Sequence, residues 1–334
     1  MTGVAILGAG FMGRVHAAGW SALSERAAVV AVHSRSAEPA ARLAESIGAE
    51  GTTELDVAIA DPSVDIVDIC LPTTLHREVA ERALAAGKHV FLEKPIALSA
   101  EDADAIVSAG ERSEGLLMVG LVLRFWPEYV ELLKRVSAGA VGRPRVVSTQ
   151  RLSPPADWND WMRDPSLSGG VPVDLLVHDF DQMNALLGRP REVFARAYGD
   201  HVVAVVAYEE GDGVAEGSMA MPTSYPFSSN IRVLGEEAVA EYAFSAAPAA
   251  EGGNIGEIAA GTLRLYRSGG DPEPVPVEGS GADPFAAEIA YFLDCVEQGR
   301  APERATAEQA RAALLVSLAA NRSLASGRPE SVLP

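Results

Sequence analysis

Val4-Ala5-Ile6-Leu7-Gly8-Ala9-Gly10-Phe11-Met12-Gly13 is the stretch of sequence that decides the fold. Four apolar residues predict a buried β-strand, and three glycines follow in a Gly-x-Gly-x-x-Gly pattern. In this pattern one glycine permits a tight turn, one lets the backbone approach a pyrophosphate, and one allows the next helix to pack closely. The helix N-terminus then offers N–H groups and a favourable dipole to phosphates. We therefore expect a dinucleotide site made by Gly8, Gly10, Phe11, Met12 and Gly13.

Short apolar segments alternate with helical patterns through the first third of the chain. The predicted strands are Val4–Leu7, Val29–Val32, Ile66–Cys70, His89–Leu92 and Leu116–Val119, and the helical patterns lie at 12–24, 38–45, 76–86 and 99–112. Continuous apolar strands separated by helices predict a parallel sheet that is covered on both faces. We expect residues 1–122 to form this dinucleotide-binding domain.

The second part of the chain, residues 123–334, predicts a substrate-binding domain of a different kind. Turn residues separate six strand candidates, at 144–152, 192–198, 201–208, 214–221, 230–234 and 263–266. Short turns predict that consecutive strands are antiparallel. Helices at 170–187 and from Asp283 onward are expected to cover one face of this sheet.

The bulk composition excludes several classes of protein. A chain of 334 residues is long for one hydrophobic core and suits two. The net charge of −19, with 46 acidic and 27 basic residues, argues against nucleic acid or an anionic membrane as a partner. Two cysteines are too few for a disulfide framework or a cysteine-based zinc site. Because no signal peptide or membrane-spanning segment is recognisable, we expect a cytoplasmic enzyme.

The end of the second predicted strand bears on the choice between NAD and NADP. An acid about 20 residues after the glycines accepts hydrogen bonds from the ribose hydroxyls of NAD. This chain has Val32-His33-Ser34-Arg35-Ser36 in that place, and no acid occurs there before Glu38. A hydroxyl and a guanidinium suit a ribose 2′-phosphate, so Ser34 and Arg35 favour NADP. The alternative is that Arg35 is a solvated loop residue and that the acid is dispensable.

Glu93-Lys94-Pro95 follows the fourth predicted strand directly. Ligands of open α/β sheets bind beyond the carboxyl ends of the strands, so we expect Lys94 to face the nicotinamide region. Pro95 stiffens the chain there, and Glu93 is a candidate partner for the lysine ammonium. A lone lysine at a strand end is otherwise usually a surface charge.

Gly169 to Asp181 predicts a helix with one polar face. Asp174, His178 and Asp181 fall at i, i+4 and i+7, on the same side of a helix. A carboxylate one turn from an imidazole orients the ring and stabilises its protonated form, which suits a general base for a hydroxyl proton. The alternatives are a structural histidine or a metal site made of the two acids and the histidine. The metal site ranks lower, since hydride transfer needs only a base and a polarising cation.

With these segments the chain resembles the glucose–fructose oxidoreductase/inositol dehydrogenase family (Gfo/Idh/MocA). The segments that carry the resemblance span nearly the whole chain and are Gly8–Gly13, Leu71–His76, Ala86–Val90, Glu93–Pro95 and Gly169–Asp181. The resemblance implies an N-terminal Rossmann domain and a C-terminal α/β domain with an open, mostly antiparallel sheet. It also implies a homodimer or homotetramer that forms through the exposed face of that sheet.

The resemblance assigns roles to individual residues. It implies that His178 takes the hydroxyl proton as a hydride leaves the same carbon for nicotinamide C4, that Lys94 polarises that oxygen, and that Asp174 orients the site. Further residues match segments that line the cofactor or lead into the substrate domain: Leu71, Thr73, His76, Glu93 and Arg124. Ser34 and Arg35 depart from the family pattern, which puts a preference for NAD in doubt.

The segment 154–164, which precedes the polar helix, bears on the substrate. Indole rings stack on sugar rings, and Asp and Asn share hydroxyl protons, so Trp158 and Trp161 suggest a polyol or pyranose. Equally, these tryptophans could anchor a loop or a subunit interface. Arg163 either favours an acidic sugar or pairs with a neighbouring aspartate. The predicted substrate site therefore combines Lys94, Trp158, Trp161, Arg163, Asp174 and His178.

These observations predict an NAD(P)-dependent oxidoreductase that acts on a secondary alcohol of a cyclic polyol or sugar, with no metal. Two other classes stay open. A redox-neutral NAD-dependent glycoside hydrolase would consume no cofactor overall. A sensor that binds NAD(P) without turnover would have no need of Lys94, Asp174 and His178.

Overall fold

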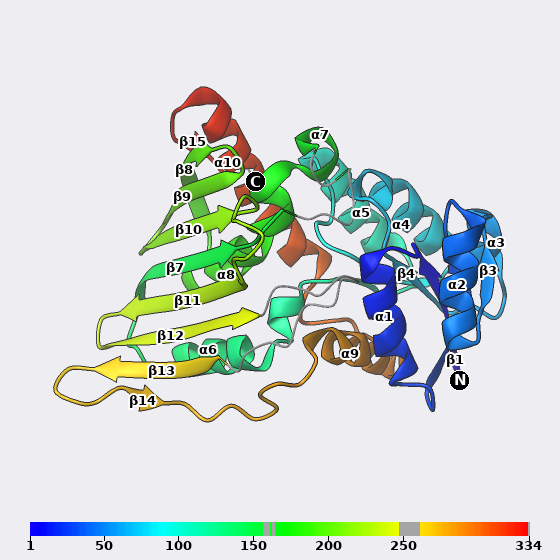
Figure 1. Ribbon diagram of the computed structural model, residues 1–334, viewed down its shortest axis with the longest axis horizontal. Coiled ribbons are helices and arrows are strands. Elements are labelled where there is room, and N and C mark those ends of the chain that lie inside the picture. Colours follow the sequence, from blue (N-terminus) through cyan, green and yellow to red (C-terminus); the bar gives the residue numbers. More distant parts are fainter. Residues whose placement is uncertain (156–160, 162–163, 247–260, 333–334) are drawn as a thin grey trace. The chain divides into compact units, whose positions relative to one another are not determined.

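The structure is a computed structural model, and it describes residues 1–155, 161, 164–246 and 261–332 (Figure 1). The chain divides into two compact units. The first unit comprises Met1–Phe125 and Asp283–Arg311, and the second comprises Trp126–Ala282 and Ala312–Pro334. The predicted domains, 1–122 and 123–334, are each continuous in sequence. The compact units differ from them because residues 283–311 pack with the first unit.

The first unit contains a six-stranded parallel sheet in the order β3-β2-β1-β4-β5-β6. Its strands are β1 (Thr2–Leu7), β2 (Ala27–His33), β3 (Glu50–Thr52), β4 (Ile66–Ile69), β5 (His89–Leu92) and β6 (Leu117–Val119). The main helices of this unit are α1 (Phe11–Ser21), α2 (Ala37–Ile47), α3 (Leu55–Ala60), α4 (His76–Ala85) and α5 (Ala100–Arg112). The order reverses between β1 and β4, so the crevice beyond their carboxyl ends is the expected ligand position of a doubly wound sheet.

The predicted strands and helices of this unit are present, with β3 and α3 in addition. Val4 to Leu7 are fully buried, as are Ile66, Val67 and Ile69 of β4. Burying each such side chain contributes about 1.5–3 kcal/mol, which explains why these runs are continuously apolar. β3 forms an exposed edge of the sheet with the sequence Glu-Gly-Thr, so it carries no apolar signal that would predict it.

Side-chain hydrogen bonds in the S/T-x-x-D/Q pattern of a capping box stabilise the first turns of two helices. Ser99 Oγ accepts a hydrogen bond from Asp102 N at 3.0 Å and donates to the Asp102 carboxylate at 2.8 Å. Gln309 N donates to Thr306 Oγ1 at 3.3 Å, and Thr306 N donates to Gln309 Oε1 at 3.0 Å. They begin α5 and α10 (Ala307–Ser326).

The helix that starts after Asp283 corrects one prediction. α9 (Pro284–Gln298) was expected to cover the second sheet, but it packs in the first unit against α1. A methyl group on Gly19 of α1 would come within 2.6 Å of Ile289 Cδ1, and the Phe292 ring stacks on Phe91 of β5 at 5.6 Å. Helical spacing identifies the apolar face of a helix but not the surface on which that face packs.

The second unit contains a nine-stranded sheet in the order β14-β13-β12-β11-β7-β10-β9-β8-β15. Its strands are β7 (Pro144–Leu152), β8 (Pro190–Tyr198), β9 (His201–Tyr208), β10 (Asp212–Ser218), β11 (Phe227–Gly235), β12 (Ala238–Ala246), β13 (Thr262–Arg267), β14 (Glu273–Pro274) and β15 (Glu330–Ser331). Every neighbouring pair is antiparallel except β10 with β7. The predicted fold class, a Rossmann domain followed by a mostly antiparallel α/β domain, is confirmed.

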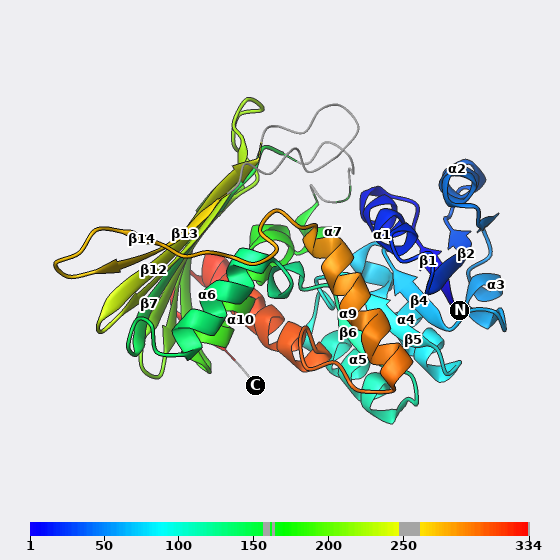
Figure 2. The same cartoon turned by 90° about the horizontal axis from the view of Figure 1, so that it is seen from below.

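The second sheet is covered on one face. In Figure 2, α6 (Pro127–Ser137) and the part of α10 that belongs to this unit lie along that face. α8 (Val177–Leu187) also packs against β7 and β10. No described helix of this unit lies on the opposite face. That face remains the open surface of the sheet.

Among the residues that the structure describes, none of the helices combines the length and apolar character that crossing a membrane requires.

Candidate active site

The three glycines of the turn between β1 and α1 have different surroundings. Gly8 has φ of +116°, and a side chain there would collide with the Cys70 carbonyl. A side chain on Gly13 would collide with the Gly8 carbonyl, so Gly13 lets α1 pack against the turn. A Cβ on Gly10, in contrast, would meet nothing within 4 Å. Gly10 is exposed and is the N-cap of α1 without a side-chain cap, so the backbone there is open to a ligand.

This arrangement fits the pyrophosphate of a dinucleotide. The helix that begins at Phe11 presents N–H groups and the positive end of its dipole beyond the open surface of Gly10. Phe11 and Met12 are both half-buried in its first turn. The three predicted glycine roles therefore each correspond to an observed local geometry.

The loop after β2 places Ser34 and Arg35 at the same carboxyl edge of the sheet. Ser34 is half-buried and Arg35 is exposed. Ser34 N donates to the Thr52 carbonyl at 3.1 Å, which fixes the loop against β3. The first acid after Arg35 is Glu38, which is exposed on α2, and its Oε1 lies 3.5 Å from Arg42 Nη1. The loop therefore presents a hydroxyl and a cation at the position where NAD-binding sites carry an acid.

The loop after β4 contains Leu71 and Thr73, starts beside the glycine-rich turn and leads to His76, the first residue of α4. Thr73 and His76 are buried, and Thr73–Leu75 form the 3₁₀ turn η1. His76 Nδ1 lies 2.9 Å from the Pro95 carbonyl, and its Nε2 lies 3.0 Å from the Leu71 carbonyl. Burial lowers the pKa of His76, so the neutral ring has one N–H and donates to one of these carbonyls at a time. His76 thereby ties the β4 loop to the segment that carries Lys94.

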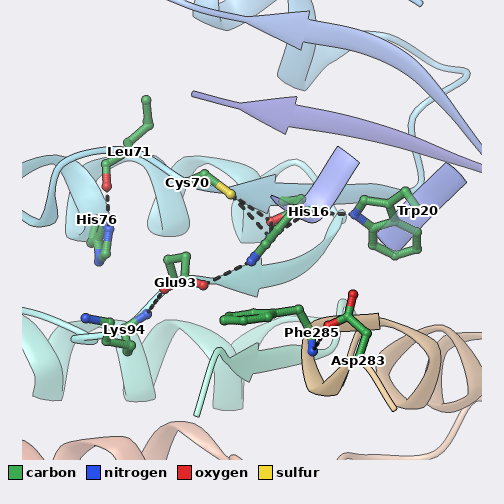
Figure 3. Close-up of polar contacts among 10 residues, drawn as sticks. His16, Trp20, Cys70, Leu71, His76, Glu93, Lys94, Asp283 and Phe285 are labelled. Carbon is green, nitrogen blue, oxygen red and sulfur yellow. Dashed lines mark hydrogen bonds and ion pairs between the residues drawn. The ribbon is translucent and has the colours of Figure 1, made fainter. Parts of the chain in front are cut away.

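Lys94 is half-buried and is the second residue after the end of β5. Its backbone N–H donates to Glu93 Oε2 at 3.0 Å (Figure 3). Glu93 is 5% exposed, and its Oε1 lies 3.0 Å from His16 Nε2. The carboxylate of Glu93 therefore holds the backbone of Lys94, a contact that sequence reasoning did not predict.

Arg124 also lies at the carboxyl edge of the first sheet. It is the last residue of the 3₁₀ turn η2 (Val122–Arg124), which follows β6, and its side chain is half-buried. Together with the segments after β1, β2, β4 and β5, it completes the set of predicted cofactor residues in this unit. The parallel pairing of these strands brings all of their carboxyl ends to one edge of the sheet.

The predicted polar helix of the second unit is not a single α-helix. Val171–Leu175 form a π-helical turn, in which Leu176 N donates to the Val171 carbonyl at 2.9 Å, and α8 begins only at Val177. The prediction that Asp174, His178 and Asp181 lie on one face of a continuous α-helix is therefore wrong, because Asp174 belongs to the π-helical turn and His178 to α8. Asp174 is 6% exposed, Asp181 is buried, and His178 is half-buried at the start of α8. π-turns of this kind are frequent at functional sites, where they redirect a side chain.

A buried ion pair fixes the start of α8. Arg151 Nε of β7 donates to Asp179 Oδ2 at 2.7 Å, with the two side chains 5% and 1% exposed. Burial lowers the pKa of Arg151, but Asp179 and Tyr129 together raise it by more, so the guanidinium stays charged. His178 directly precedes Asp179, so this pair anchors the backbone that presents the histidine.

Of the predicted substrate residues, Trp158 and Arg163 lie outside the described residues. Trp161 is half-buried, and its carbonyl accepts a hydrogen bond from Asp164 N at 3.2 Å. Asp164 caps the short helix α7 (Pro165–Ser168) by accepting from Ser166 N. The prediction that the tryptophans stack on a sugar therefore stays a prediction.

Comparison with known proteins identifies two matching family models. Residues 2–121 match a model described as an oxidoreductase family with an NAD-binding Rossmann fold, GFO/IDH/MocA. Residues 129–241 match the model of the GFO/IDH/MocA C-terminal domain. The first model matches a segment within the predicted domain 1–122, and the second matches residues 129–241 within the predicted domain 123–334.

Individual relatives agree with these models. The chain is 28% identical to scyllo-inositol 2-dehydrogenase (NAD(+)) of Bacillus subtilis, over 97% of this chain and 94% of that protein. It is 36% identical to an inositol 2-dehydrogenase of Rhizobium meliloti, over 58% of this chain and 57% of that protein. The crystal structure of a putative myo-inositol dehydrogenase from Sinorhizobium meliloti matches with a TM-score of 0.80 and 28% identity, over the full length of both chains.

Proposed function

The chain belongs to the GFO/IDH/MocA oxidoreductase family, and on this basis we propose that it oxidises a secondary alcohol of a cyclic polyol or sugar with NAD(P). The observation that carries the proposal is the glycine-rich turn at the switch point of the first sheet, with Lys94 at the carboxyl end of nearby β5. The full-length similarity to an inositol dehydrogenase supports the substrate class.

The cofactor contributes the hydride acceptor when it is bound, and the protein contributes the rest. Gly8, Gly10 and Gly13 shape the pyrophosphate site, and Phe11 and Met12 flank it in the first turn of α1. The loops after β4 and β5, with Leu71, Thr73, His76 and Glu93, and Arg124 after β6, line the remainder of the cofactor site. All of these segments lie at one edge of the sheet, as the binding of an extended dinucleotide requires.

Three side chains handle the proton and the charge on the substrate oxygen. His178 accepts the hydroxyl proton as a general base, a role that requires a neutral imidazole in the resting state. Lys94 donates a hydrogen bond to the same oxygen and stabilises the negative charge that develops there. Asp174 orients the site beside His178.

We further propose that the enzyme prefers NADP to NAD. The loop after β2 offers Ser34 and exposed Arg35 where a ribose 2′-phosphate would lie, and the first acid in the loop region is turned to Arg42 on α2. A guanidinium binds a phosphate through two parallel, charge-assisted hydrogen bonds.

The substrate class within this proposal is a cyclic polyol or pyranose, with Trp158, Trp161 and Arg163 as further substrate contacts. Many closely spaced hydroxyls distinguish such compounds from simple alcohols. The segment 154–164 has the aromatic and acidic composition that suits them.

We propose that the open face of the second sheet forms a homodimer or homotetramer. Neighbouring strands place Phe194, Val205 and Val214 side by side on this face, and Val203 lies beside them on β9. Phe194 is 37% exposed, and Val203 and Val205 are each 42% exposed. A contiguous apolar patch of this kind is typical of an interface. A second copy can supply the same apolar patch through two-fold symmetry.

The cytoplasm is the location that fits this proposal. Both cysteines, Cys70 and Cys295, are free thiols, which is the usual state in a reducing compartment.

The experiment that tests the proposal follows the absorbance of reduced nicotinamide with a panel of inositols, aldoses and ketoses, with NAD and NADP in parallel. Continuous reduction of one cofactor by one compound supports the proposal and identifies the substrate. Cofactor binding without reduction by any compound would contradict it. Cleavage of a glycoside without net cofactor consumption would identify the redox-neutral reaction instead.

A further inference from the structure

The first unit buries four ionisable side chains in one cluster. These come from four different segments: His16 of α1, Asp68 of β4, Glu93 after β5 and Glu288 of α9. Glu93 is 5% exposed and the other three are completely buried. Burying charge is costly unless each charge is paired, so such a cluster needs a physical reason.

His16 lies between two carboxylates. Its Nδ1 is 2.9 Å from Asp68 Oδ1, and its Nε2 is 3.0 Å from Glu93 Oε1. A neutral imidazole has one N–H and would leave a lone pair facing one of these carboxylates. Burial is the largest single influence and lowers the pKa of His16, but Asp68 and Cys70 together raise it by more, so the pKa lies well above its ordinary value. The ring is therefore an imidazolium that donates to both carboxylates.

The surroundings of His16 fix the ring in this position. Trp20 Nε1 donates to Asp68 Oδ2 at 2.7 Å, and the Phe91 ring stacks on the imidazole at 5.2 Å with an interplanar angle of 14°. Cys70 Sγ lies 3.3 Å from His16 Nδ1, and burial raises the pKa of this thiol, so it stays neutral. Figure 3 shows His16 between Cys70 on one side and Glu93 on the other.

Glu288 faces the same cluster from α9. One of its carboxyl oxygens, a ring nitrogen of His16 and a Glu93 carboxylate oxygen all lie within 4.8 Å of one another. Burial, and then the nearby Glu93 carboxylate, raise the pKa of Glu288 well above its ordinary value, so it is a neutral acid. The cluster thus holds one cation, two anions and one neutral carboxyl.

The cluster leads directly to Lys94. The Glu93 carboxylate binds His16 with one oxygen and accepts from the Lys94 backbone N–H with the other, at 3.0 Å. Gly120 leaves room for this carboxylate, because a methyl group there would come within 3.1 Å of Glu93 Oε1. Pro95, the residue after Lys94, is also held, because its carbonyl oxygen lies 2.9 Å from His76 Nδ1.

We infer that His16 is a positioning residue for Lys94: as an imidazolium clamped by Asp68, it fixes the Glu93 carboxylate that holds the Lys94 backbone. The inference rests on the proposed function, in which Lys94 acts on the substrate oxygen. An error of 1 Å in the position of a catalytic group can cost about 10²-fold in rate, so a partial loss of this support should cost about 10-fold.

The test compares His16→Gln, Glu93→Gln and the double variant, with His89→Gln as the matched control. His89 belongs to β5 as well, and its ring accepts a hydrogen bond from Leu116 N at the opposite end of that strand. We expect His16→Gln to lower kcat about 10-fold with little change in the KM for the cofactor. Because His16 acts through Glu93, the same substitution should have little further effect in the Glu93→Gln background. The inference would be overturned if the fold-losses in kcat of the two single variants multiply in the double variant. It would also be overturned if His16→Gln leaves kcat unchanged.

A second readout needs no turnover. The rate at which a small anhydride acylates Lys94, mapped by peptide mass spectrometry, reports the environment of this amine, and Lys134 serves as the exposed internal reference. His16→Gln should change the Lys94 rate and leave the Lys134 rate unchanged. An unchanged Lys94 rate would contradict the positioning role even if no substrate is found. Absence of wild-type turnover together with a changed Lys94 rate would overturn the proposed function and not the positioning.

Discussion

The residues of the proposed site have two kinds of role: some act on the substrate, and others fix the position of those that do. Lys94 and His178 are half-buried, which leaves part of each side chain accessible. Three buried residues hold the backbone on either side of these two: Glu93 and His76 contact the segment of Lys94, and Asp179 pairs with Arg151 beside His178. Substitution should therefore separate the two groups by their effects on turnover and on stability.

Lys94→Ala and His178→Ala should each lower kcat by about 10²-fold or more, because each removes a group that acts on the substrate oxygen or its proton. Cofactor binding, measured by fluorescence titration, should persist in both. Lys134→Ala and His201→Ala are matched controls on exposed or half-exposed positions and should behave as the wild type. Wild-type turnover in either active-site variant would remove that residue from the mechanism.

Arg35→Ala should raise the KM for NADP by about 10- to 100-fold, the equivalent of one or two charge-assisted hydrogen bonds. The KM for NAD should change little, because NAD has no 2′-phosphate. Arg42→Ala is the control, since it removes the same charge from exposed α2 nearby. Equal effects of Arg35→Ala on both cofactors would contradict the proposed NADP preference.

The sequence predicts those site residues that are neighbours in the chain. Gly8 to Gly13 and Glu93 to Pro95 are contiguous motifs with a defined place beside a strand, so pattern and position suffice. His16 and Asp68 are 52 positions apart and lie in an unremarkable helix and strand. Only the folded sheet brings them together with Glu93, so no local pattern could have identified the cluster.

At the scale of secondary-structure elements, the strands with strong apolar runs are predicted almost to the residue. β7 and β9 have the predicted bounds. β12 was not predicted, although Ala240, Tyr242 and Phe244 alternate with more exposed residues as a half-buried strand requires. The π-turn before α8 could not be predicted, since its residues carry the same apolar spacing as an α-helix.

The buried acid of α9 predicts a pH dependence of stability. The pKa of Glu288 is raised by burial and by Glu93 above its ordinary value of 4.5, so the folded state binds this proton more tightly than the unfolded chain. This contribution to stability is complete below the ordinary pKa and is lost as the pH rises through the folded-state pKa. Glu288→Gln keeps the shape and removes the titration.

Between about pH 5 and pH 8, the melting temperature of the wild type should therefore fall relative to that of Glu288→Gln. Glu297→Gln, at the exposed end of the same helix beside Arg26, is the control and should follow the wild type. If the melting temperatures of the wild type and of Glu288→Gln change with pH by the same amount across this range, Glu288 does not hold the proton.

At the scale of the whole molecule, the chain is two units whose sheets differ in kind. The parallel sheet is built from β1 to β6 and has its ligand edge where the strand order reverses. The second sheet has one face covered by α6, α8 and α10 and the other open. Sequence patterns predict both sheets, but they place α9 on the second sheet, which is wrong. The apolar spacing of an amphipathic helix shows which of its faces is buried, but not which sheet or helix that face packs against.

Association of copies through the open face gives a further prediction. Val205→Glu places a charge between Phe194 and Val214 on neighbouring strands, so it should shift the assembly to a smaller species in multi-angle light scattering. Val57→Glu is the matched control, because Val57 is 60% exposed on α3 of the other unit. An unchanged mass for Val205→Glu would place the interface elsewhere or show that the protein is a monomer.

The central claim is that the protein moves a hydride from a substrate carbon to the nicotinamide. The most direct measurement uses the active polyol or sugar with deuterium on its ring carbons and examines the recovered cofactor by mass spectrometry and NMR. We predict one deuterium at nicotinamide C4 and a slower chemical step with the labelled substrate. Recovery of unlabelled reduced cofactor, or return of the label to the sugar with no net reduction, would contradict the account.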